Sequence, residues 1–361
     1  MVEYNFLSDE WDSEPYPDYF YEWDEAMKEG RSPGFVDAEE LCDIIDIYFE
    51  EDDIDNARYA VDYAFKLYPN DEDLVYDVLL LLNDYERWND LLALAEKHKG
   101  VQQVWVDGHK LTALLHLGME EDAFHCFRKM KIKYAAELDG LFVLYQAMGE
   151  ALYEVDLFDA CVDVMKEAIA LMGQEPEWYW LQLHSYLAKE DKEKVMNHCL
   201  IIQHLRPLDG ETWNRIAFIY KDVDETAKEI EAFEFAHLLG YKDPASYINL
   251  IYAYEKNGNL KKALENIDEY IPLQPDNYFV HLMAANISSQ LENWQKSLLY
   301  INDAIKIKPE LDSLYSYKAN FLMAIGETQK AVKVLEEGIL KTGDPEGELA
   351  KQLKNIIQNN S

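Results

Sequence analysis

The sequence predicts an all-α protein in which antiparallel helix pairs stack into a right-handed superhelix, an α-solenoid. Two observations support this fold class. Apolar residues recur at helical spacing, and the same arrangement returns every 34 residues through most of the 361-residue chain. A unit of this length is too short to bury its own apolar face, so neighbouring units must stack to share a core.

The arrangement is clearest in the unit formed by residues 244–277. Its first helix has an apolar stripe at positions i, i+3, i+4 and i+7, namely Tyr247, Leu250, Ile251 and Tyr254. Gly258 then lies in a turn, and the small Ala263 allows a second helix to approach the first closely. Pro275 ends the unit, because proline cannot continue a helix.

These positions match the pattern W-x2-L-G-x2-Y…A-x3-F…P, so the unit resembles a tetratricopeptide (TPR) repeat. Six units, this one included, share one register, with starts at 142, 176, 210, 244, 278 and 312. The resemblance covers most of the chain. It implies that each unit is a helix–turn–helix pair and that the first helices line a groove in which partners bind.

Residues 1–37 do not fit the repeat. They combine many carboxylates with aromatic residues, namely Trp11, Tyr16, Tyr19, Phe20, Tyr21 and Trp23. Pro15 and Pro17 favour an extended start, and a short helix is expected from Asp18 to about Glu29. We interpret this segment as a cap that covers the open end of the first repeat. One alternative is a detachable arm that folds into the protein's own groove or onto a partner. The other is a disordered segment.

Three further repeats precede the six, with starts near 38, 72 and 104. The third repeat is the poorest match, and the starts from 38 to 142 are separated by 34, 32 and 38 residues. The extra residues lie around Lys131 to Gly140, which indicates a longer helix or loop there. The prediction is therefore nine repeats over residues 38–343.

Residues 344–361 are expected to form a C-terminal capping helix. Asp344 is placed as its N-cap, and Pro345 suits the first helical position. The residues expected to face inward are Leu349, Leu353, Ile356 and Ile357.

The net charge of −37 makes nucleic acid and anionic membrane surfaces poor partners, because phosphates are repelled. The charge is uneven: residues 1–55 contain 20 acidic and 2 basic side chains. No basic leader and no long apolar run are visible, and the four cysteines form no C-x-x-C pair. We expect a cytoplasmic protein with reduced thiols at Cys42, Cys126, Cys161 and Cys199.

Signs of catalysis are weak. The sequence lacks a phosphate-binding glycine loop, the zinc motif H-E-x-x-H and the nucleophile motif G-x-S-x-G. His125-Cys126 and His198-Cys199 are adjacent pairs, whose side chains point about 100° apart on a helix and so make poor metal sites. We expect no cofactor, no metal and no enzymatic activity, and we keep an unrecognised enzyme as a remote alternative.

We number the residues of each repeat from its start and call these positions slots. The TPR resemblance implies that slots 2, 5, 9, 12 and 13 of each repeat face the groove. The expected partner-binding residues are Asp46, Phe49, Glu50, Tyr76, Asp84, Glu150, Tyr153, Glu154, Trp180, His184, Phe218, Tyr252 and Phe279. Aromatic rings beside carboxylates suit a basic or amphipathic protein segment. About half of these rings are alternatively expected to pack against adjacent helices.

One mode of binding within the family is disfavoured. TPR modules that hold a terminal carboxylate use lysine and asparagine at slots 5 and 9. Here slot 5 has no basic residue in any repeat, being Cys42, Tyr76, Gly108, Gln146, Trp180, Asn214, Ile248, Leu282 and Ser316. The leading hypothesis is therefore a protein-interaction scaffold whose partner is basic or amphipathic. The second hypothesis is a homodimer formed through the N-terminal aromatic segment or the flank of the array.

Overall fold

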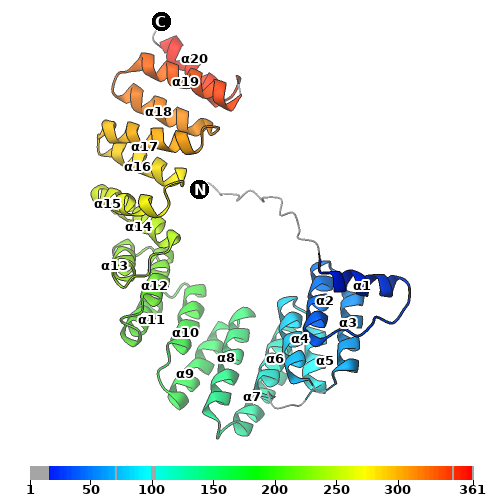
Figure 1. Ribbon diagram of the computed structural model, residues 1–361. Coiled ribbons are helices and arrows are strands. Elements are labelled where there is room, and N and C mark those ends of the chain that lie inside the picture. The colour runs from blue at the N-terminus through cyan, green and yellow to red at the C-terminus, as the bar shows by residue number, and fades with distance from the viewer. Residues whose placement is uncertain (1–15, 70, 99–102, 344, 360–361) are drawn as a thin grey trace. The chain divides into compact units, whose positions relative to one another are not determined.

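The computed structural model describes residues 16–69, 71–98, 103–343 and 345–359. In these ranges every regular element is a helix, and the chain divides into two compact units, Met1–Asp191 (unit 1) and Lys192–Ser361 (unit 2). Figure 1 shows helices packed side by side in each unit. No helix within the described ranges is long and apolar enough to cross a membrane.

The described residues of unit 1 form a short N-terminal helix, four helix pairs and the first helix of a fifth. The helices are α1 (Asp18–Lys28), α2 (Ala38–Glu50), α3 (Ile54–Leu67), α4 (Glu72–Asp84), α5 (Trp88–Lys97), α6 (Gln103–His116), α7 (Glu120–Lys133), α8 (Leu138–Glu154), α9 (Phe158–Met172) and α10 (Pro176–Ala188). The first helices of successive pairs contact each other: α2 contacts α4, α4 contacts α6, α6 contacts α8, and α8 contacts α10. The first helices therefore form one continuous layer in this unit.

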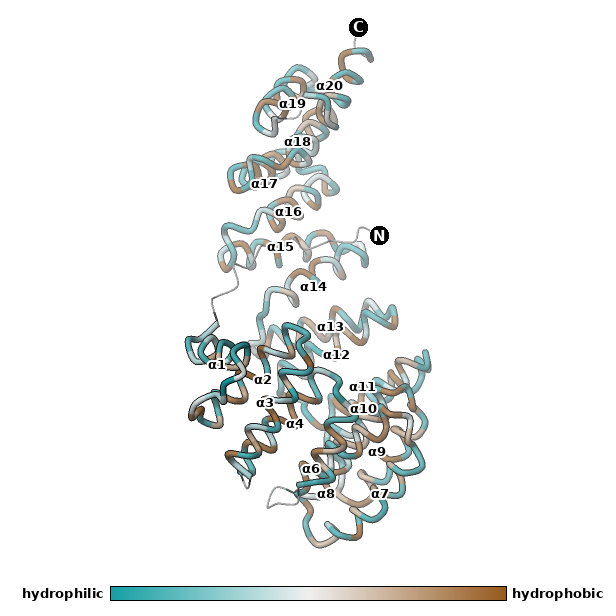
Figure 2. The backbone as a smooth tube through the Cα atoms, turned by 90° about the vertical axis from the view of Figure 1, so that its right-hand side faces the viewer, coloured by the Kyte–Doolittle hydropathy of each residue, from teal (hydrophilic) through white to brown (hydrophobic). Residues whose placement is uncertain are grey.

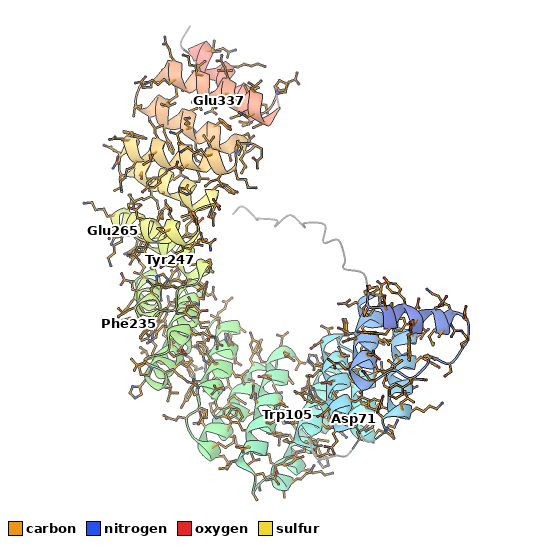
Figure 3. The ribbon with its side chains drawn as sticks, viewed as in Figure 1. Asp71, Trp105, Phe235, Tyr247, Glu265 and Glu337 are labelled. Atoms are coloured by element: carbon orange, nitrogen blue, oxygen red, sulfur yellow. The ribbon has the colours of Figure 1, made fainter. Side chains whose placement is uncertain are left out.

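Unit 2 continues the alternation with more uniform spacing. Its elements are α11 (Lys192–Leu205), α12 (Gly210–Asp222), α13 (Thr226–Leu238), α14 (Pro244–Lys256), α15 (Leu260–Tyr270), the 3₁₀ turn η1 (Ile271–Leu273), α16 (Tyr278–Gln290), α17 (Trp294–Ile307), α18 (Asp312–Ala324), α19 (Thr328–Thr342) and α20 (Glu348–Asn359). Each helix from α11 to α20 contacts the next one. Figure 3 marks Phe235 and Tyr247 on neighbouring helices of this unit.

The helix boundaries follow the sequence register. Helices begin at seven of the expected repeat starts, namely 38, 72, 176, 210, 244, 278 and 312. The other two starts, expected at 104 and 142, are at Gln103 and Leu138. Most of the extra residues before the fourth repeat lengthen α8, which has 17 residues where α10, α12 and α14 have 13.

A left-handed residue recurs in the turn between the two helices of each pair. These residues are Asp52, Glu86, Gly118, Asp156, Glu190, Asp224, Gly258, Glu292 and Gly326. The next amide closes the turn by donating to a carbonyl in the last turn of the first helix, as Asn259 does to Tyr254 at 2.8 Å. The spacing of these residues reproduces the irregular steps of 32 and 38 residues. Backbone geometry and sequence period therefore agree independently.

The core is formed by small and large apolar side chains at the slots that face neighbouring helices. Among the small residues, Ala57, Ala123, Ala263 and Ala331 of the second helices are completely buried. Figure 2 shows the resulting alternation of hydrophobic and hydrophilic residues along each helix.

Both terminal helices cover apolar residues. In α1, Phe20 and Trp23 are 6 % and 2 % exposed and belong to the same core cluster as α2 and α3. The Trp23 ring packs edge-on against Tyr63 with 5.1 Å between centroids. At the other end, Leu349 of α20 is 2 % exposed and packs in one cluster with α18 and α19. Residues 1–15, 344, 360 and 361 of the two terminal segments lie outside the described residues. Helix α20 begins at Glu348, so Pro345 is not its first helical residue, and Ile357, expected to face inward, is 50 % exposed.

Candidate functional site

The first helices of unit 1 present an acidic surface, which we call the groove face. We define it as slots 2, 5, 6, 9, 12 and 13 of the repeats that start at 38, 72, 104, 142 and 176. These slots contain no lysine or arginine and ten carboxylates: Glu39, Asp43, Asp46, Glu50, Asp73, Asp77, Asp84, Glu150, Glu154 and Glu177. The groove face is therefore suited to cationic ligands.

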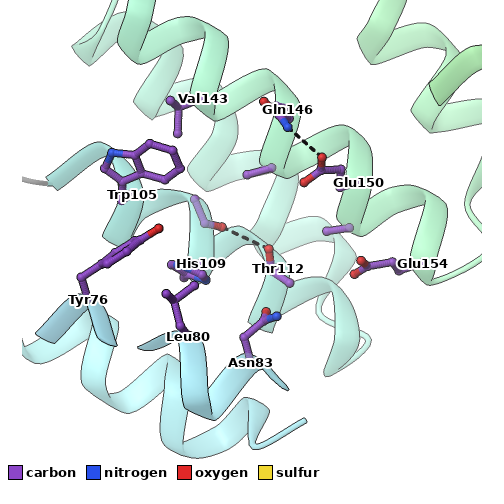
Figure 4. Close-up of a pocket in the computed structure, with 13 residues that line it drawn as sticks. Tyr76, Leu80, Asn83, Trp105, His109, Thr112, Val143, Gln146, Glu150 and Glu154 are labelled. Atoms are coloured by element: carbon purple, nitrogen blue, oxygen red, sulfur yellow. Dashed lines mark hydrogen bonds between the residues drawn. The ribbon is translucent and has the colours of Figure 1, made fainter. Parts of the chain in front are cut away.

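A hollow of about 230 Å³ opens on this face between α4, α6 and α8 (Figure 4). Two aromatic side chains form one side of it. Tyr76 from α4 and Trp105 from α6 meet edge-on, with 5.9 Å between ring centroids and 71° between ring planes. Trp105 remains 43 % exposed, so much of the indole surface is available to a ligand.

His109 lies beside the aromatic pair, with its ring centroid 6.2 Å from that of Tyr76. Burial lowers the pKa of His109 below its usual value near 6.5, and the nearby Asp84 opposes this shift only in part. The imidazole is therefore mostly neutral at pH 7, and the hollow has no cationic side chain of its own among its lining residues.

Carboxylates from α8 form the opposite side of the hollow. Gln146 Nε2 donates a hydrogen bond to Glu150 Oε1 at 2.9 Å, which orients that carboxylate. Glu154 Oε2 lies 3.0 Å from His116 Nε2, and the His116 ring stacks on Trp88 with centroids 3.9 Å apart. Figure 4 shows Glu150 and Glu154 on the helix that faces Tyr76 and Trp105.

The floor of the hollow depends on a glycine. A Cβ atom at Gly108 would lie 3.2 Å from the Cβ atom of Ala147, so α6 and α8 approach as closely as small residues permit. Gly108 thus lets α8 pack close against α6 at the floor of the hollow.

Comparison with known proteins identifies the architecture. No protein-family model matches the chain, and no curated protein matches it. Among solved structures, the C-terminal part of a TPR repeat-containing protein from Cytophaga hutchinsonii is 15 % identical, with a TM-score of 0.51. The match covers 68 % of this chain and 98 % of that one. This chain has the TPR solenoid fold.

Two other solved TPR-like structures align less well. MamA is 17 % identical with a TM-score of 0.42, covering 48 % of this chain and 95 % of that one. YrrB, described as a TPR protein with an unusual peptide-binding site, is 14 % identical with a TM-score of 0.33 and covers 63 % and 97 %. At these scores neither structure adds to the fold assignment.

Three of the residues expected in the TPR groove line the hollow, namely Tyr76, Glu150 and Glu154. Asp84 lies just outside and acts on the hollow through its charge near His109. The expected set missed Trp105, although this residue occupies slot 2 of the third repeat. The slot rule selects Trp105 once that repeat is accepted as starting at 104.

A second group of expected residues gathers between α8 and α10. Tyr153 and His184 lie with ring centroids 6.2 Å apart, and His184 stacks on Trp180 at 6.0 Å. Trp180 is only 8 % exposed, so this ring is part of the packing and offers little surface to a partner.

The third group lies at the end of α2. Phe49 is 5 % exposed and stacks on Tyr85 at 5.0 Å, so it is a core ring as well. Tyr85 donates to Asp46 at 2.7 Å, and burial with this bond raises the pKa of Tyr85 above its usual value. Glu50 is exposed at the edge of the face.

The expected residues of unit 2 are more scattered. Phe218 is half-buried and meets Phe233 edge-on at 5.3 Å. Phe279 is half-buried, and Tyr252 is 45 % exposed. The three rings belong to three different first helices, α12, α14 and α16.

The described residues include no cluster of three or more His, Cys, Asp or Glu side chains able to hold a metal ion. The cysteines are free thiols, and Cys42 on the groove face has its pKa raised to about 12 by burial and by Asp77 and other carboxylates. A thiol with so high a pKa is protonated at neutral pH and is a poor nucleophile.

Proposed function

We propose that this TPR protein binds a basic or amphipathic segment of another protein along the groove face of unit 1. The observation that carries the proposal is the composition of that face. Ten carboxylates and an aromatic hollow occur there with no lysine or arginine. A basic segment would neutralise this charge and cover the exposed ring of Trp105 in the same contact.

Long-range electrostatics support the same polarity. Residues 1–191 carry 45 acidic and 14 basic side chains, a net charge of −31 of the total −37. A field of this sign accelerates the encounter with cationic segments and repels acidic ones, and salt weakens it. Association should therefore become slower as ionic strength rises.

Binding of defined peptides tests the proposal. We would measure fluorescence anisotropy of a labelled basic amphipathic peptide, a twin with its lysine and arginine residues replaced by glutamine, and an acidic twin. The full chain should bind the basic peptide alone. Raising the salt from about 50 to 500 mM should weaken binding by about tenfold or more, because surface charges are screened within a few ångströms at high salt.

A matched pair of variants distinguishes the groove face from the overall charge. The triple variant Asp46→Asn/Asp84→Asn/Glu150→Gln removes three carboxylates from the groove face. The control Asp55→Asn/Glu121→Gln/Asp163→Asn removes three from the second helices α3, α7 and α9. The groove variant should bind the basic peptide much more weakly than the control. Equal weakening in both would mean that net charge alone attracts the peptide, and the proposal would fail.

Self-association through the N-terminal aromatic segment is less well supported. The rings of Phe20 and Trp23 pack into the core of unit 1, and Tyr63 Oη donates to Pro33 O at 2.8 Å. Phe20 and Trp23 are therefore not available to a second copy of the chain, whereas Tyr21 and Phe35 remain 50 % and 85 % exposed. We therefore retain a partner protein, and not a second copy, as the proposed ligand.

A further inference from the structure

We propose that the hollow between α4, α6 and α8 is a pocket for one arginine side chain of the partner. This inference rests on the proposed function and names the side chain that anchors the segment. The hollow measures about 230 Å³, which is below the roughly 300–1,000 Å³ of typical small-molecule pockets. It therefore suits a single long side chain better than a metabolite or cofactor.

The charge of the hollow selects a cation. Glu150 and Glu154 face it from α8, and Asp84 is near enough to influence His109 from α4. His109 is held mostly neutral at pH 7 by burial, so no fixed positive charge of the lining competes with a ligand. An anionic or neutral side chain would leave these carboxylates without a counter-charge.

The aromatic side of the hollow selects a flat cation. The indole of Trp105 is 43 % exposed, and Tyr76 braces it edge-on from α4. A guanidinium group can lie against an indole face and keep its in-plane N–H groups directed outward at the same time. An ammonium group lacks this plane and is more strongly hydrated, so it gains less from the same surface.

The carboxylate side supplies acceptors for the guanidinium N–H groups. Gln146 binds Oε1 of Glu150 and so fixes the carboxylate, which still has lone pairs to accept from a ligand. Glu154 is held by His116, whose ring is stacked on Trp88. Because Glu154 lies beside His116, eleven residues along α6 from Trp105, Glu150 is the anchored carboxylate nearer the indole. We therefore assign Glu150 as the acceptor for a guanidinium group on Trp105, and Glu154 as a more distant negative charge.

A binding experiment with single-residue probes tests the assignment. The full chain is labelled with 5-fluorotryptophan, and its ¹⁹F spectrum is recorded with N-acetyl-arginine amide, N-acetyl-lysine amide and N-acetyl-citrulline amide. The variant Trp105→Phe identifies the Trp105 resonance by its loss. The arginine probe should shift this resonance saturably at millimolar concentration, the lysine probe at least about fivefold more weakly, and neutral citrulline not at all.

Carboxylate variants then test the geometry. Glu150→Gln/Glu154→Gln should weaken binding of the arginine probe by about tenfold, because a charge-assisted hydrogen bond to Glu150 and the nearby charge of Glu154 are lost. The control Glu121→Gln/Glu137→Gln, with both changes outside the lining of the hollow, should leave the affinity unchanged. All four glutamates are exposed, and matching melting temperatures would establish that the variants fold alike.

The outcomes separate this inference from the proposed function. If citrulline or lysine shifts the Trp105 resonance as strongly as arginine, the assignment of an arginine pocket is overturned. The same holds if no probe moves the resonance while the basic peptide still binds the groove face, and the proposed function then survives. If the basic peptide itself does not bind, the proposed function fails first.

Discussion

The two units have the same backbone plan but differ in surface charge: unit 1 is strongly acidic and unit 2 is nearly neutral. Residues 1–191 carry a net charge of −31 and six of the eight tryptophans, whereas residues 192–361 carry −6 and two. The corresponding groove slots of unit 2 include several amides, namely Asn214, Asn249, Asn286, Gln290 and Asn320. Arg215, Lys221 and Lys256 balance the carboxylates of those slots. The repeat thus fixes the buried slots and leaves the groove slots free to differ.

The units also differ in regularity. Every expected repeat start in unit 2 is 34 residues from the next, whereas unit 1 contains the steps of 32 and 38 residues. The hollow lies in the same region of the chain. It is lined by α6 and the long α8, and these are the two helices whose starts depart from the expected register. Irregular spacing and candidate binding chemistry therefore coincide in one region of unit 1.

The largest expected effect concerns the two ends of the array. We propose that α1 caps unit 1 as α20 caps unit 2. Trp23→Ala should destabilise unit 1 by about 3–5 kcal/mol, and Leu349→Ala should destabilise unit 2 by about 2–4 kcal/mol, because each removes a buried side chain. Hydrogen exchange would localise each effect to its unit. The control Phe35→Ala changes a ring that is 85 % exposed and should have little effect. Loss of less than about 1 kcal/mol in Trp23→Ala would contradict the capping role.

The next effect concerns the irregular step in unit 1. Asp107 is 8 % exposed and accepts hydrogen bonds from Gln103 at 3.1 Å, from Lys133 at 2.8 Å and from Tyr134 at 2.7 Å. Asp107→Ala should cost about 2–4 kcal/mol in the free energy of unfolding, mainly because the hydroxyl of buried Tyr134 loses its acceptor.

Guanidinium denaturation would measure this loss, and Tyr134→Phe should cost only about 1 kcal/mol. Since Asp107 adjoins Gly108, the alanine variant should also weaken the basic peptide. An Asp107→Ala protein as stable as the wild type would show that the network does not hold the irregular step together.

Much of the fold is predictable from the sequence because the period reports burial directly. Tyr247, Leu250 and Ile251 repeat because each must face a neighbouring helix, and all three are at most 1 % exposed. The start of α8 was displaced by four residues, since an extension of a helix leaves the register of the residues after it unchanged. Slot rules therefore locate the helices but do not fix their first turns.

The site is less predictable, because a slot defines the direction in which a side chain points from its helix but not how much of that side chain is exposed. Phe49 and Trp180 occupy groove slots, yet Phe49 stacks on Tyr85 and Trp180 on His184. Whether a ring becomes surface or core depends on the size of its neighbours in the next repeat. Trp105 stays exposed beside Gly108, a slot where other repeats place larger residues.

A smaller effect concerns the left-handed turn residues, which are glycine in one of five positions in unit 1 and two of four in unit 2. In unit 2, Glu292→Gly should stabilise by about 0.5–1 kcal/mol, because relief of the strain at φ 56° exceeds the added entropy of the unfolded chain. Gly258→Ala, at φ 73°, should destabilise by about 1 kcal/mol. Chemical denaturation of the two variants would measure both changes in the free energy of unfolding. Effects of the same sign would mean that the backbone at these turns adapts to the side chain.

The smallest expected effect is a pH dependence of peptide binding to the groove face of unit 1. Because the folded-state pKa of His109 is lowered, the native protein binds fewer protons than the unfolded chain near pH 6. The stability associated with neutral His109 is therefore complete above about pH 6.5 and is lost as pH falls toward the lowered value. Protonation also places a positive charge in the hollow, among Tyr76 and Asp84 from α4, His116 from α6, and Glu150 and Glu154 from α8.

Binding of the basic peptide should accordingly weaken between pH 7.5 and 5.5, by about threefold at most, as a like charge at several ångströms costs under 1 kcal/mol in a water-like dielectric. His109→Gln cannot take up this proton and should lose most of the pH dependence, which anisotropy titrations at the two pH values would show. The control His116→Gln changes a histidine that lies beside Glu154 but does not line the hollow, and this variant should keep most of the pH dependence. If wild type and His109→Gln respond to pH alike, the carboxylates of unit 1 and not His109 control the charge of the hollow.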